Sequence, residues 1–112
     1  VLNNLSWTLD QQGDPKALEY AEKAYAAAPT NPQIQDTYGW MLVNRGDAKR
    51  GLELLAKAAV GAPKDLQTRI HLAMALIKTG DKSGAKKELE AIMQSSEDVP
   101  LKAEARKLLQ SL

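Results

Sequence analysis

Few side chains in this sequence have the types and spacing that active-site chemistry requires. The chain of 112 residues contains one histidine, His71, and no cysteine. A cysteine-ligated zinc site, a disulfide framework and a thiol nucleophile are therefore excluded within these residues. His71 has no second histidine with which to share a metal, and a core or groove position is the simpler explanation for a single histidine. We predict no catalytic residue, no metal and no cofactor.

Paired acidic residues also occur, but their spacing does not suit acid–base catalysis. Glu88 and Glu90 are two residues apart, and residues at that spacing on a helix do not face each other. Glu97 and Asp98 are adjacent in an expected turn, where acidic side chains usually cap a helix or stay solvated. The glycines stand singly, so no glycine-rich phosphate loop is present. The sequence predicts that the protein is not an enzyme.

The charge balance argues against two further classes of partner. The 15 basic and 14 acidic residues give a net charge of +1, whereas nucleic-acid binders normally show a strong basic excess. The small cluster Lys82, Lys86 and Lys87 is more simply a solvated face than a phosphate or lipid contact. No apolar run approaches the roughly 20 residues that cross a bilayer. We predict no nucleic-acid partner and no direct membrane insertion by this segment.

A repeat of about 34 residues, a helical-repeat period, organises the chain. Gly-Asp pairs occur at residues 13–14, 46–47 and 80–81. A left-handed glycine ends one helix and the aspartate caps the next, while Asn31-Pro32 is a cap followed by a proline suited to the first helical position. Apolar residues recur at helical spacing between these marks. The expected helices cover about 1–12, 15–28, 32–45, 48–61, 66–79, 82–95 and 99–111.

This pattern resembles the tetratricopeptide repeat family, whose unit is a helix–turn–helix. The second unit matches best, through Tyr38-Gly39, Gly46-Asp47 and Pro63. Gln35 and Arg69 depart from the family by standing where it favours tryptophan. Gly51 replaces the family's alanine and permits a close helix approach. The resemblance implies an all-α fold, a right-handed α–α superhelix of three helix–turn–helix repeats followed by a C-terminal capping helix. The expected units are residues 1–31, 32–65 and 66–98, with the capping helix at 99–112.

In this family the inner face of the first helices forms a groove that usually binds an extended peptide or a helix. Trp7 and Trp40 fall in the same column of that face, and tryptophan is enriched at binding hot spots. Packing between neighbouring first helices is the alternative role for both indoles. No lysine or arginine stands in the columns that grip a terminal carboxylate in some members. The stripe expected on this face is Asn3, Trp7, Asp10, Asp36, Trp40, Val43, Ile70, Met74 and Ile77. The predicted partner-binding residues are Asn3, Asn4, Trp7, Asp36, Trp40, Asn44, Ile70, His71, Met74 and Lys78.

The resemblance implies a non-catalytic scaffold that binds a protein or peptide partner and forms the C-terminal part of a longer repeat protein. The alternative is a structural end-cap, or a module for homo-oligomerisation through the uncapped N-terminal end. The phrases at residues 2–7, 36–40 and 46–55 are similar to the C-terminal repeats of bacterial lipoproteins that accompany exosortase and exopolysaccharide systems. That narrower resemblance implies a location in the bacterial periplasm or envelope.

Overall fold

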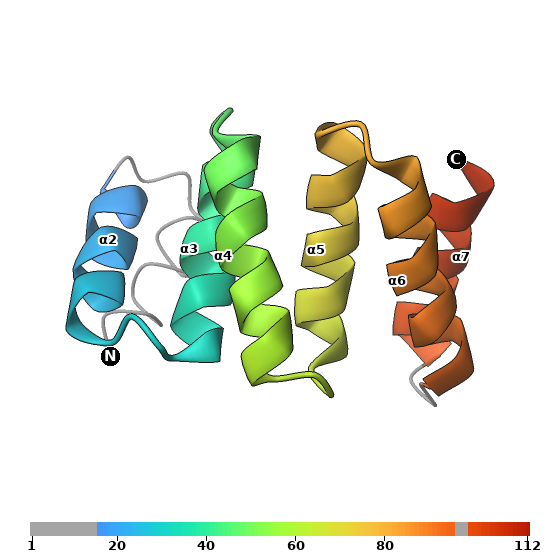
Figure 1. The fold of residues 1–112 in the computed structure, drawn as a ribbon, viewed down its shortest axis with the longest axis horizontal. Helices are drawn as coiled ribbons and strands as arrows, with labels where there is room; N and C mark the ends of the chain where they lie inside the picture. The colour runs from blue at the N-terminus through green and yellow to red at the C-terminus, as the bar shows by residue number, and fades with distance from the viewer. Residues whose placement is uncertain (1–15, 96–98) are drawn as a thin grey trace.

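The computed structural model describes residues 16–95 and 99–112, and its regular elements within these ranges are all α-helices. Their order is α2 (Ala17–Ala27), α3 (Pro32–Asn44), α4 (Ala48–Gly61), α5 (Leu66–Lys78), α6 (Lys82–Ser95) and α7 (Val99–Gln110). Each helix contacts the next, so the chain runs from one end of the molecule to the other (Figure 1). The predicted all-α repeat fold is confirmed. The expected helix at 1–12 and the turn at 13–14 lie outside the described residues.

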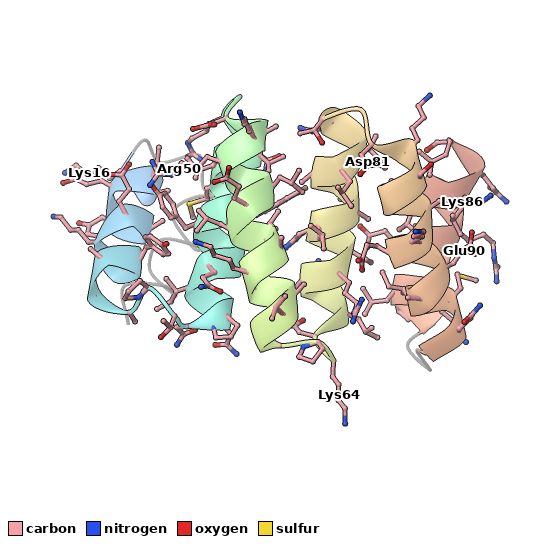
Figure 2. All side chains as sticks on the ribbon, viewed as in Figure 1. Lys16, Arg50, Lys64, Asp81, Lys86 and Glu90 are labelled. Carbon is pink, nitrogen blue, oxygen red and sulfur yellow. The ribbon has the colours of Figure 1, made fainter. Side chains whose placement is uncertain are left out.

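The two Gly-Asp turns within the described ranges have the predicted geometry. Gly46 and Gly80 have φ of +94° and +90°, the left-handed conformation that glycine adopts without strain. The carboxylates of Asp47 and Asp81 then accept a hydrogen bond from the backbone N–H three residues further on, at 3.4 and 2.8 Å. Figure 2 shows Asp81 at the turn between α5 and α6. Each pair thus ends one helix and begins the next.

Side-chain caps also begin α3 and α5. Asn31 Oδ1 accepts from the backbone N–H groups of Gln33 and Ile34 at 2.9 and 3.3 Å, with Pro32 at the first helical position. Asp65 caps α5 in the same way. Because these caps satisfy N–H groups that have no partner inside the helix, they fix where each first helix starts.

The helices α3 and α4 cross at a pair of glycines, Gly39 and Gly51. A Cβ atom built on Gly51 would lie 2.5 Å from the Gly39 carbonyl oxygen, and one built on Gly39 would lie 2.9 Å from the Gly51 carbonyl oxygen. Real Cβ atoms do not approach that closely, so a side chain at either position would force the helices apart. The predicted close approach at Gly51 is confirmed.

The buried side chains form three core clusters, each joining three consecutive helices. The first cluster contains Ala17, Ala21, Tyr38, Met41, Leu42 and Leu54, from α2 to α4. The second cluster contains Val43, Leu55, Leu72 and Ala75, from α3 to α5. The third cluster contains Ile70, Ala73, Leu89, Ile92 and Ala105, from α5 to α7. Overlapping clusters of this kind are typical of a repeat protein, in which each unit packs mainly against its neighbours.

The two residues that replace the family tryptophan make equivalent hydrogen bonds. Gln35 Nε2 donates to the Pro29 carbonyl at 2.8 Å, and Arg69 Nε donates to the Pro63 carbonyl at 2.9 Å. Arg69 Nη1 also donates to Glu88 Oε2 at 2.9 Å. Both side chains therefore tie the turn between units to the first helix of the next unit, a role that sequence reasoning missed.

Candidate functional site

Two of the predicted partner-binding residues, Trp40 and His71, form an aromatic stack between the first helices of two neighbouring repeats. The indole of Trp40, on α3, stacks on the imidazole of His71, on α5, with ring centroids 4.3 Å apart and planes 11° apart. Trp40 remains partly exposed, whereas His71 is buried. We call Asp36, Trp40, Gln67 and His71 the Trp40 cluster.

Hydrogen bonds hold the imidazole of His71 on both sides. Its Nδ1 lies 2.7 Å from Asp36 Oδ1 on α3, and its Nε2 lies 3.2 Å from Gln67 Nε2 on its own helix. An amide nitrogen only donates, so with this amide orientation His71 Nε2 accepts and the Nδ1–H donates to Asp36. His71 thereby bridges the two first helices, α3 and α5.

Three further predicted residues follow this cluster along the same two helices. Asn44 is one helical turn beyond Trp40 and is exposed. Met74, half-buried, and Lys78, exposed, are at positions three and seven residues beyond His71, a spacing that keeps them on one side of α5. We call Trp40, Asn44, Met74 and Lys78 the inner face. It combines an aromatic ring, a thioether, an amide and one positive charge.

Two residues of the predicted stripe are buried in the core. Ile70, one of the predicted partner-binding residues, is fully buried in the third core cluster with Ala105 of α7. Val43 is buried in the second core cluster, and its Cγ2 lies 2.5 Å from the position that a Cβ on Gly51 would take. Neither side chain can contact a partner while the helices stay packed. Ile77 of the same stripe is half-buried on α5. The predicted residues Asn3, Asn4, Trp7 and Asp10 lie outside the described residues.

His71 was expected at a core or groove position and was also among the predicted partner-binding residues. Its side chain is 6% exposed, and both ring nitrogens have hydrogen-bond partners within the protein. Gln67, expected from the sequence as a groove residue that could supply a hydrogen bond but not placed among the partner-binding residues, lies with its Nε2 3.2 Å from His71 Nε2. The spacing of 35 residues between Asp36 and His71, one repeat plus one residue, is the sequence signal that relates them.

In residues 16–95 and 99–112, no three His, Asp or Glu side chains come together as a metal site would require. None of the helices in these ranges is both long enough and apolar enough to cross a membrane. Lys86 and Glu90, both exposed, lie on α6 (Figure 2) with Nζ and Oε1 4.0 Å apart, a separation at which a surface pair contributes little.

Comparisons with known proteins agree with this architecture. The sequence profile described as tetratricopeptide repeat matches residues 42–112. No curated protein matches the chain. The type III secretion chaperone SycD of Yersinia enterocolitica, solved with a peptide of the translocator YopD, is 16% identical with a TM-score of 0.84, over 98% of this chain and 88% of that chain.

Two further solved structures have the same fold. PcrH, solved with the chaperone-binding region of PopD, is 17% identical with a TM-score of 0.84, over 98% of this chain and 86% of that chain. YrrB, described as having an unusual peptide-binding site, is 20% identical with a TM-score of 0.80, over 95% of this chain and 55% of that chain. At these identities the likeness concerns the fold.

Proposed function

Because the chain belongs to the tetratricopeptide repeat family, we propose that it is a non-catalytic scaffold that binds a peptide or a helix of another protein on its inner face. The observation that carries the proposal is the partly exposed indole of Trp40, which stacks on the buried imidazole of His71 with ring centroids 4.3 Å apart. A tryptophan held in this way offers a large apolar area at low conformational cost.

The chemistry of the inner face supports a partner with apolar side chains. Met74 adapts its shape to irregular apolar groups, and it lies between the Trp40 cluster and the exposed Lys78 along α5. Asn44 and Lys78, each four residues beyond Trp40 and Met74 on their helices, are exposed, and polar groups around an apolar contact can set the register of a bound segment. The peptide complexes of SycD and PcrH are consistent with this use of the fold.

Peptide selection tests the proposal without knowledge of the natural partner. Peptides selected from a random phage library should perturb the NMR signals of Trp40, Asn44, Met74 and Lys78. Trp40→Ala should weaken their binding by about 30-fold or more, as expected for a tryptophan hot spot. Val60→Ala is the matched control, because Val60 is 82% exposed on α4 outside this face. Selected peptides that bind Trp40→Ala and Met74→Ala with unchanged affinity would refute the assignment.

The second candidate function is a structural end-cap or a homo-oligomerisation module. The polar exposed residues of α7 favour it, because Glu104, Arg106, Lys107 and Gln110 face solvent while Ala105 packs into the third core cluster. Such a helix covers the apolar edge of a repeat stack. Sedimentation equilibrium separates the candidates: a dimer that resists dilution supports self-association, and a monomer over the whole concentration range opposes it.

A further inference from the structure

The Trp40 cluster orients one aromatic ring through two hydrogen-bonded layers. Trp40 contacts His71 face to face, with the two ring planes only 11° apart. His71 is in turn held at Nδ1 by Asp36, at 2.7 Å, and at Nε2 by Gln67, at 3.2 Å. The side chains of His71 and Asp36 are 6% and 15% exposed, so water replaces these bonds poorly.

Each member of the cluster limits the freedom of the next. The imidazole cannot rotate about its Cβ–Cγ bond without losing the hydrogen bond to Asp36 or the one to Gln67. The indole cannot turn about its own side-chain bonds without losing the stack. Because Asp36 and Trp40 lie one turn apart on α3 and His71 lies on α5, the arrangement also depends on the relative position of the two first helices.

We infer that His71 is a positioning residue, which fixes the Trp40 indole in one orientation before a partner binds, and that Asp36 acts through it. The benefit of this positioning for partner binding rests on the proposed function, whereas the contacts that position Trp40 do not depend on it. An anchor that is ordered in advance lowers the entropy lost on binding. The occupant that fits is an apolar or aromatic side chain of the partner segment, placed over the exposed part of a flat, immobile indole.

The orientation of Trp40 can be measured in the free protein. The chain has two tryptophans, so a Trp7→Phe background leaves Trp40 as the single reporter. With 5-fluorotryptophan, we expect one narrow ¹⁹F resonance and a strong near-UV circular dichroism band. His71→Ala should broaden or split the resonance and weaken the band. An unchanged Trp40 signal in a folded His71→Ala protein would overturn the inference, with far-UV circular dichroism as the folding check.

Two substitutions of Asp36 distinguish a positioning role from a general loss of structure. They also test the inference if the His71→Ala protein does not fold. Asn at position 36 can still accept from the Nδ1–H of His71, whereas Ala cannot. Asp36→Asn should therefore retain the Trp40 signal and Asp36→Ala should lose it. Gln94→Ala, an exposed amide on α6, is the matched control and should change nothing. Equal signals in Asp36→Asn and Asp36→Ala would count against the inference.

Peptide affinity distinguishes this inference from the proposed function. If both hold, His71→Ala weakens a selected peptide by about tenfold, and the loss is not additive with Trp40→Ala because the two residues act as a unit. If His71→Ala disorders Trp40 but neither variant changes affinity, positioning stands and the proposed function fails. If His71→Ala lowers affinity while the Trp40 signal stays the same, positioning is overturned.

Discussion

At the scale of single residues, two buried threonines on neighbouring first helices differ by one hydrogen bond. Thr37 Oγ1 donates to the Gln33 carbonyl at 3.0 Å, whereas Thr68 Oγ1 has no hydrogen-bond partner among the residues that the structure describes. A buried hydroxyl without a partner costs roughly 1–3 kcal/mol. We expect Thr68→Val to raise the free energy of unfolding by about 1 kcal/mol and Thr37→Val to lower it by about 1 kcal/mol. Urea denaturation measures both changes, and changes of the same sign would contradict this explanation.

Because Tyr38 is buried, we expect the stability of the protein to depend on pH in the alkaline range. Burial raises the pKa of the Tyr38 phenol above its usual 10.0, and the charge of Arg50 opposes this increase. The folded state therefore keeps the phenolic proton at a pH where the unfolded state has begun to lose it, so the free energy of unfolding falls as the pH rises above about 10. Tyr38→Phe should reduce that fall in denaturation series from about pH 9 to about pH 11, and Tyr20→Phe is the control. An identical fall in Tyr38→Phe would contradict the assignment.

Helical spacing predicted the residues of the α3–α5 junction better than it predicted their contacts. Asp36, Trp40 and His71 were all among the predicted partner-binding residues, and His71 contacts both of the others. Ile70 shares that column but is buried in the third core cluster. Spacing indicates which side chains share a stripe of one helix, but which neighbouring helix covers that stripe depends on packing between units. The same limitation explains why His71 was expected to contact a partner.

At the scale of helices, the Gly39–Gly51 crossing sets how closely α3 and α4 pack. Gly51→Ala places a methyl group 2.5 Å from both the Gly39 carbonyl oxygen and Val43 Cγ2. Alanine favours the helix by about 1 kcal/mol over glycine, yet overpacking typically costs about 1–3 kcal/mol. We expect a net loss of about 1–2 kcal/mol, measured by thermal or urea denaturation. Ser83→Thr, which adds one methyl at an exposed position of α6, should change stability little. A Gly51→Ala protein more stable than the wild type would contradict this prediction and would mean that α3 and α4 move apart at little cost.

Helix bounds were predictable because the signals that set them are local. Gly46, Asp47 and Asn31 act within a few residues of their own position, so the helix ends that they set can be predicted from the neighbouring residues. The roles of Gln35 and Arg69 could not be read in this way. The absent tryptophan indicates only a departure from the family pattern, and the bonds to the proline carbonyls depend on how the turn folds back over the helix.

At the scale of the whole molecule, the three overlapping core clusters predict that the two ends open independently. Leu89, fully buried, belongs to the third core cluster, and Leu54 belongs to the first. Either Leu→Ala substitution should cost about 2–5 kcal/mol through lost burial and a cavity. Because stability in stacked repeats is a sum of unit and interface terms, the loss should stay near the substituted cluster.

Hydrogen exchange measured residue by residue tests this prediction with the two variants as each other's control. Leu89→Ala should accelerate exchange of the amides in α6 and α7 and leave α2 and α3 nearly as protected as before, because among the described residues the third core cluster is the one that joins α6 to α7. Leu54→Ala should do the reverse. An equal acceleration along all six helices in both variants would show that the described part of the chain opens as one cooperative unit. In that case the shared helix α5, which contributes Leu72 to the second core cluster and Ile70 to the third, would couple the ends more strongly than the separate clusters suggest.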